Sequence, residues 1–155
     1  MAEAFEPATL QDLPDLVDVY FSAFSSEVMT NIFPATPEGR EFMRQLYEKC
    51  IKSEPGSQST KVFVVRDDQG KAVSSAVYYM IGTEDGGLWP WPKRLPTSLP
   101  ESTSAGKFDA FFGKMAIQHE ATMKDEPHVC MYNSQRWPVP CIVTLELSSC
   151  LPTDT

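Results

Sequence analysis

Four aromatic residues and one carboxylate are, by residue type, the side chains best suited to binding a small molecule. Aromatic side chains offer a large apolar contact area with few rotatable bonds, and they commonly line small-molecule pockets. Glu27, just past the first predicted helix, carries a carboxylate that can hold an amine or remove its proton. The candidate substrate pocket lies between the first two predicted helices and a proline-rich loop, and it comprises Phe24, Glu27, Phe33, Trp89 and Trp91.

Four of these residues, Phe24, Glu27, Trp89 and Trp91, also have a structural interpretation, which we favour. Phe24 continues the apolar stripe of a helix and would then belong to the core, while the two tryptophans would pin the proline-rich loop to the body. Glu27 would be a solvated surface carboxylate, as most glutamates are. The sequence therefore names candidate pocket residues and assigns no catalytic or cofactor-binding residue.

Other reactive side chains lack the partners that catalysis or metal binding requires. The run Ser22-Ala-Phe-Ser25-Ser26 has no nucleophile-elbow pattern and no spaced Asp/His set, which argues against a hydrolase. His119 lies on an apolar helical stripe, so we interpret it as a partly buried structural histidine. The four cysteines include no CxxC pair and have one histidine nearby, so we expect free thiols and no metal site.

Composition narrows the class of protein. The 155 residues are 42% hydrophobic and 22% charged, which is typical of one globular domain with a core. The formal charge is −8 and no block of Lys or Arg occurs, which argues against nucleic-acid binding because phosphates require clustered cations. The sequence shows no signal-peptide pattern and no apolar run long enough for a membrane span. We therefore expect a cytoplasmic protein with no nucleic-acid or membrane partner.

Three segments have hydrophobic residues at helical spacing. The first begins after the polar run that ends at Asp12, with Pro14 in its first turn, and the second begins with the cap Thr36-Pro37-Glu38. A linker joins them, and residues 86–105 form a long proline-rich loop before a third helix that starts at Gly106. The three stripes are Leu13, Leu16, Val17, Tyr20, Phe21 and Phe24; Phe42, Met43, Leu46, Tyr47, Cys50 and Ile51; and Phe108, Phe111, Phe112, Met115, His119 and Met123.

Strands are also predicted at four places before the last segment of the chain. Phe5–Ala8 predicts a short first strand. Lys61–Arg66 and Ala72–Ile81 are rich in β-branched and aromatic residues, and the loop between them ends in Gly70, which can adopt positive φ. These two segments predict a β-hairpin. His128-Val129 predicts the start of another strand.

This order of elements, together with four short sequence words, resembles the GCN5-related N-acetyltransferase (GNAT) family, in particular its fungal small-molecule members. The words are Phe5-Glu-Pro-Ala-Thr9, Asp12-Leu-Pro14, Val17-Asp-Val-Tyr-Phe-Ser-Ala-Phe24 and Pro127-His-Val129. The resemblance covers about residues 4–129. It implies an α+β fold with a mixed, mostly antiparallel sheet and flanking helices, incomplete at the C-terminal side. It also implies that the helices present here wall the acceptor-substrate side.

The cofactor motif of that family, Q/R-x-x-G-x-G/A, does not occur in this sequence. In the family it follows a long central strand, and its backbone N–H groups hold the pyrophosphate of coenzyme A at a helix N-terminus. Residues 130–155 contain no glycine, and Gln135-Arg136 is followed by Trp137-Pro138, so the motif does not map onto them. Acetyl-CoA is therefore the expected cosubstrate only if the chain is active.

We divide the chain into an acceptor-side portion, residues 1–129, and a divergent tail, residues 130–155, in which 139–147 has strand composition. The composition changes at Cys130 in the way that a frame change or a retained intron would produce. We therefore expect a truncated or alternatively spliced product, and the alternative is an intact but divergent protein. Segment 139–147 could pair beside Ala72–Ile81, where the family's central strand would lie. If it does not, Ala72–Ile81 is left with an exposed apolar edge.

Two hypotheses of function follow. The first is an acyl-CoA-dependent N-acyltransferase acting on a small-molecule amine, with low or no activity if the chain is truncated. The second is a non-catalytic GNAT-like module that serves in binding or dimerisation as a homodimer. The pyrophosphate loop discriminates between them, because its absence argues for weak or absent cofactor binding.

Overall fold

The fold is built on a four-stranded sheet in the order β1-β2-β3-β4, and each neighbouring pair is antiparallel. The computed structural model describes residues 5–53, 59–81, 98–123 and 128–135. The strands are β1 (Glu6–Pro7), β2 (Ser59–Arg66), β3 (Ala72–Ile81) and β4 (His128–Gln135). The sheet and its helices confirm the predicted α+β class with a mostly antiparallel sheet.

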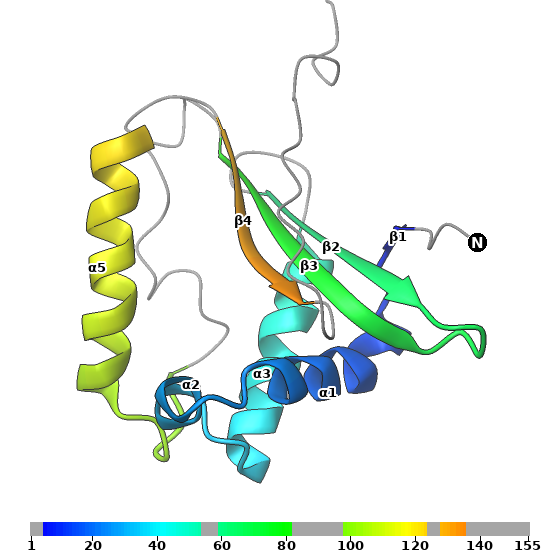
Figure 1. Cartoon of the computed structure of the whole chain (residues 1–155), viewed down its shortest axis with the longest axis horizontal. Coiled ribbons are helices and arrows are strands. Elements are labelled where there is room, and N and C mark those ends of the chain that lie inside the picture. Colours follow the sequence, from blue (N-terminus) through cyan, green and yellow to red (C-terminus); the bar gives the residue numbers. More distant parts are fainter. Residues whose placement is uncertain (1–4, 54–58, 82–97, 124–127, 136–155) are drawn as a thin grey trace, which may run out of the picture.

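Two helices, α1 and α3, pack against the sheet, and a third, α5, stands apart from it at the side of the molecule (Figure 1). They are α1 (Leu13–Ala23), α2 (Glu27–Ile32), α3 (Pro37–Ile51) and α5 (Ala105–Met123), and a short 3-10 turn, Leu10–Asp12, leads into α1. α1 packs on α3 and on β3, and α3 packs on β2. α5 stands at the side of the molecule, next to α2. The three helices predicted from periodicity are confirmed within one or two residues.

Local capping explains where the two core helices begin. The hydroxyl of Thr36 accepts a hydrogen bond from the N–H of Gly39 at 3.1 Å, which satisfies one of the unpaired donors of the first turn of α3. Pro37 occupies the first helical position, where a missing N–H costs nothing. Pro14 lies in the first turn of α1 for the same reason.

The linker expected between the first two predicted helices is wrong in part, because it contains α2. Ser26 has extended backbone angles, its carbonyl accepts from the N–H of Thr30 at 2.9 Å, and the acidic Glu27 occupies the first turn. These are start signals of a helix. The six residues of α2 are too few to show an apolar period, so periodicity did not predict it.

The β2–β3 hairpin closes through a tight turn that requires a glycine. Gly70 has φ of 81°, in the left-handed region that side chains disfavour. The carboxylate of Asp67 accepts from the N–H groups of Gln69 and Lys71 at 3.0 and 2.9 Å, which holds the turn. The predicted hairpin is confirmed, and β2 begins two residues earlier than expected.

β3 is paired on both edges, so the exposed edge considered from the sequence does not arise. The strand on its second edge is β4, so the expectation that 139–147 fills this place is wrong. β2 pairs with one edge, and β4 pairs with the other from Ser75↔Gln135 to Ile81↔His128. The strand start predicted at His128-Val129 is confirmed, and the strand continues across position 129 as far as Gln135. Segment 139–147 is outside the residues that the structure describes, and the two-part division of the chain stays a prediction.

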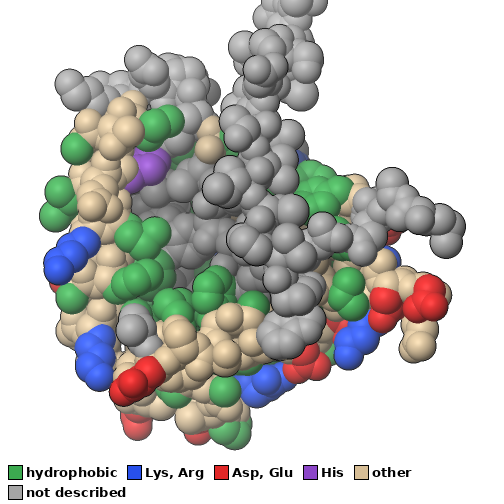
Figure 2. Space-filling model, viewed as in Figure 1, with side chains coloured by type: hydrophobic (Ala, Val, Ile, Leu, Met, Phe, Trp, Pro, Cys, Tyr) green, Lys and Arg blue, Asp and Glu red, His purple; other side chains and the backbone are tan. Residues whose placement is uncertain are grey.

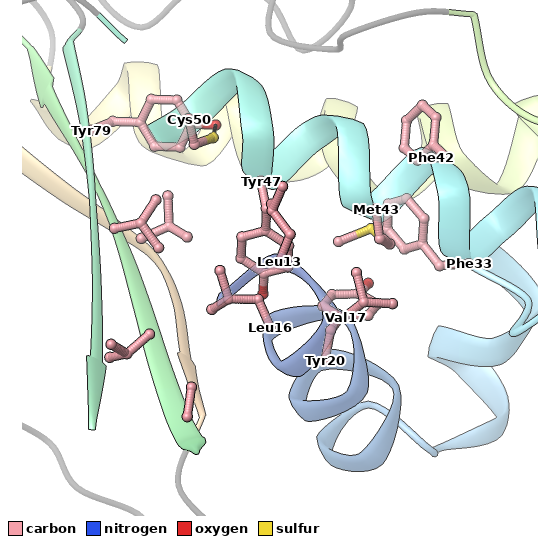
Figure 3. Packing of buried hydrophobic residues seen from close by; sticks show 14 of the residues in the cluster. Leu13, Leu16, Val17, Tyr20, Phe33, Phe42, Met43, Tyr47, Cys50 and Tyr79 are labelled. Carbon is pink, nitrogen blue, oxygen red and sulfur yellow. Dashed lines mark hydrogen bonds between the residues drawn. The ribbon is translucent and has the colours of Figure 1, made fainter. Parts of the chain in front are cut away.

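The core lies between the sheet and the pair of helices α1 and α3 (Figure 3). Leu16 from α1 and Val64 from β2 are completely buried. Cys50 is also buried, with its sulfur 3.9 Å from the hydroxyl of Tyr79, and it is a free thiol. The central strands are therefore anchored by helices that come before them in the sequence.

Candidate functional site

A groove of about 580 Å³ lies between α2 and α5 and is open to solvent. Its apolar wall is made of Ile32 from α2 and of Ala110, Phe111 and Met115 from α5. Ile32 is buried, Phe111 is half-buried and Met115 is 44% exposed. The groove therefore offers apolar surface that the described residues leave accessible, and its volume is within the size range of small-molecule pockets.

The polar lining of the groove consists of amides and ammonium groups. Asn31 comes from α2, and Lys107, Lys114 and Gln118 come from α5. None of the described residues that line the groove is acidic, although the whole chain has 21 acidic and 13 basic residues. Figure 2 shows basic and hydrophobic side chains side by side along α5. The described lining thus carries two positive charges and no negative charge, on a protein of net negative charge.

Phe33 packs in the core between the two helices that form this groove. It is 6% exposed, and its ring centroid lies 5.8 Å from that of Tyr20 and 5.3 and 6.1 Å from those of Phe108 and Phe112. Aromatic pairs at such separations are attractive beyond their buried area. Phe33 follows α2 directly, so this cluster joins the end of α2 to α1 and to the start of α5.

The structure places the other predicted pocket residues apart from the groove lining. Phe24 is half-buried, with its ring 5.0 Å from that of Tyr20. Glu27 is exposed at the first position of α2. Phe24, Glu27 and Phe33 therefore come from neighbouring segments without lining one described cavity. Trp89 and Trp91 fall in the segment 82–97, outside the described residues, and the five-residue pocket stays a prediction.

The most buried carboxylate of the described chain, that of Asp12, has a structural role. Asp12 is 4% exposed, and its carboxylate receives hydrogen bonds from Arg66 and Thr9. The Arg66 guanidinium holds the pKa of the Asp12 carboxyl below its usual value of 3.8, and burial opposes this only in part. A carboxylate with a lowered pKa and both oxygens engaged is a weak base, so these contacts indicate a structural role.

The described residues do not supply the pyrophosphate loop that acetyl-CoA binding in the GNAT family requires. β4 ends at Gln135, and the structure describes no residue after it. The remaining sequence, 136–155, contains no glycine. Neither the described residues nor the sequence of 136–155 therefore offers the glycine-containing donor arrangement that the family uses for the pyrophosphate of coenzyme A.

Among the described residues, no three His, Cys, Asp or Glu side chains come together as a metal site would need. None of the described helices has both the length and the hydrophobicity of a membrane-spanning segment.

Comparison with known proteins yields one structural likeness. The chain matches no protein-family model. It matches no curated protein sequence either. A crystal structure described as histone acetyltransferase HPA2 and related acetyltransferase, from Corynebacterium glutamicum, is 22% identical over 81% of this chain and 74% of that chain, with a TM-score of 0.37. The description of the fold rests on the strand order and helix packing given above.

Sequence reasoning missed the groove, although part of its signal was present. Phe111 and Met115 belong to the predicted apolar stripe of the third helix. Lys107 and Lys114 are seven residues apart, which is two helical turns, so they share one side of α5. The partner wall, Asn31 and Ile32, comes from α2, the helix that periodicity did not predict.

Proposed function

We propose that the chain is a GNAT-type domain of an acyl-CoA-dependent N-acyltransferase that takes a small-molecule amine. The observation that carries the proposal is the antiparallel order β1-β2-β3-β4 with α1 and α3 on β3 and β2. This arrangement follows the order of elements that the sequence resemblance implies for the acceptor-side half of the family fold. Acetyl-CoA is the cosubstrate under this proposal.

A second candidate function is a non-catalytic GNAT-like module that serves in binding or dimerisation. It is favoured by one specific observation, the absence of glycine from 130–155, where the family places its pyrophosphate loop. Backbone N–H groups approach a pyrophosphate closely only where side chains are small. Under this proposal the chain keeps the fold of the family and has little or no acyltransferase activity.

Thermal unfolding with and without acetyl-CoA separates the two candidates. A ligand that binds only the native state adds RT ln(1 + [L]/Kd), about 2.7 kcal/mol at a hundredfold excess over Kd. For a domain of this size that is a rise in Tm of several degrees. A rise in Tm, together with acetyl-CoA-dependent release of free thiol in the presence of small primary amines, is the result expected of the enzyme. A cooperative transition that acetyl-CoA does not move, with no thiol release, supports the non-catalytic module and contradicts the enzyme.

Glu27 is the candidate group for holding or deprotonating the amine, and the chain offers a matched control. Glu38 is also exposed and also lies in the first turn of a helix, α3. Under the enzyme proposal, Glu27→Gln lowers the rate of thiol release and Glu38→Gln leaves it unchanged. Equal rates for the two variants would remove Glu27 from the proposed site while leaving the family assignment to the Tm measurement.

A further inference from the structure

We propose that the groove between α2 and α5 binds an amphipathic organic anion, a small molecule with an apolar body and a carboxylate. The juxtaposition that points to it is an apolar wall, with Phe111 and Met115 accessible and Ile32 buried behind them, beside the ammonium groups of Lys107 and Lys114. This inference is independent of the proposed acyltransferase function, since no part of the groove lining belongs to the acetyl-CoA motif.

The apolar wall accounts for the body of the ligand. α5 turns Phe108 and Phe112 into the core, where they are 1% and 5% exposed, and it turns Phe111 and Met115 to the groove. Met115 is 44% exposed in a position that continues the apolar stripe of the helix. Burying such a surface against an apolar ligand is favourable in proportion to the area removed from water. A methionine also adapts to ligands of different shapes.

Charge complementarity accounts for the acidic group of the ligand. Lys107 and Lys114 both line the groove, about 10 Å apart along α5, and the described lining contains no carboxylate to compete for them. Neither lysine forms an ion pair among the described side chains. A cationic ligand would be repelled at this position, and a carboxylate would be attracted.

The position of Lys107 adds to the local positive potential. It stands in the first turn of α5, where the helix dipole favours acidic side chains, and that turn contains no acidic residue. A lysine at that position does not stabilise the helix, because its charge has the same sign as the N-terminal end of the helix dipole. Positions where local rules of stability are broken are frequently functional. Here the lysine and the helix dipole both act in favour of an anion at the groove.

The dimensions of the groove favour a small molecule over a peptide. Its volume of about 580 Å³ lies in the range of small-molecule sites. The wall on the α2 side comes from the end of a helix of six residues, which is too short to support a long peptide. The ligand we expect is thus an alkyl or aryl carboxylate rather than an acidic protein segment.

Isothermal titration calorimetry of the full chain with decanoate, below its micelle concentration, tests the proposal. Decanol and decylamine carry the same alkyl chain with a neutral and a positive group. We expect saturable binding of decanoate, several-fold weaker binding of decanol and the weakest binding of decylamine. Because exposed charge pairs contribute modestly, Lys107→Gln and Lys114→Gln should each weaken decanoate binding about two- to fivefold.

Two further variants make the result decisive. Lys71→Gln removes an exposed lysine at the β2–β3 turn, far from the groove, and should leave the affinity unchanged (Figure 1). Ala110→Trp fills the groove from an exposed helical position and should abolish binding while the Tm stays close to that of the unmodified chain. Absence of decanoate binding, equal affinity for the three probes, or equal effects of Lys71→Gln and the groove lysine variants would overturn the proposal.

Discussion

Arg66 closes over Asp12 with two parallel hydrogen bonds. Nη1 donates to Oδ1 at 2.5 Å and Nη2 donates to Oδ2 at 2.9 Å, although the residues are 54 positions apart. The N–H of Thr9 donates to the same Oδ2 at 2.7 Å. The pair therefore fastens the turn before α1 to the end of β2. Bidentate pairing of this kind is the strong form of a charged hydrogen bond.

Asp12→Asn should lower the free energy of unfolding by about 1–3 kcal/mol, since it removes the charge from a buried, hydrogen-bonded group. Urea unfolding measures this directly. Asp18→Asn is the matched control, because Asp18 pairs with Arg40 in an exposed position and should cost less than about 1 kcal/mol. Equal losses for the two variants would show that burial of the Asp12 pair does not matter.

Acid should remove the contribution of Asp12. Arg66 lowers the pKa of Asp12 in the folded state, so the native state binds fewer protons than the unfolded state around the usual pKa of 3.8. The stabilisation is complete above that value and is lost as pH falls through the lower, folded-state pKa. The difference in unfolding free energy between the unmodified chain and Asp12→Asn should be constant from about pH 7 to 5 and shrink below about pH 4. A difference that does not change on acidification would contradict this.

Gly39 and Gly113 should respond oppositely to alanine. A Cβ on Gly39 would stand 2.0 Å from the carbonyl oxygen of Pro34, so Gly39→Ala must displace backbone and should cost about 1–3 kcal/mol. A Cβ on Gly113 would have nothing within 4 Å, and Gly113→Ala should stabilise α5 by about 0.5–1 kcal/mol. Thermal melts of both variants test the pair. Similar shifts in the same direction would refute the close approach of Gly39 to Pro34.

Ser75 and Thr60 form a second pair with opposite expectations. Ser75 is 1% exposed, and its hydroxyl has no hydrogen-bond partner among the described residues, so Ser75→Ala should stabilise the fold by about 1 kcal/mol. The hydroxyl of Thr60 donates to the carbonyl of Cys50 at 2.7 Å, so Thr60→Val should destabilise it by about 1–3 kcal/mol. Chemical unfolding gives both values. A loss of stability in Ser75→Ala would reveal a partner for that hydroxyl.

Elements with strong local signals were predictable from sequence. The stripes of α1, α3 and α5 repeat over several turns, and the hairpin has both strand composition and a glycine turn. α2 was not predicted because six residues are too few to show a helical hydrophobic period. Only Ser26 and Glu27 marked its start. The groove was not predicted either, since one of its walls belongs to α2.

The sequence by itself determined the order and type of most elements, the acidic charge and the absence of a glycine loop after position 129. These depend on residues that are close together in the chain or on simple composition. Only the tertiary structure decided that Arg66 meets Asp12, that Phe33 joins α2 to α5, and that Lys107 and Lys114 face an apolar wall. These contacts depend on how segments distant in the sequence pack together. Close packing in the core determines which side chains touch, and no local sequence pattern specifies those pairs.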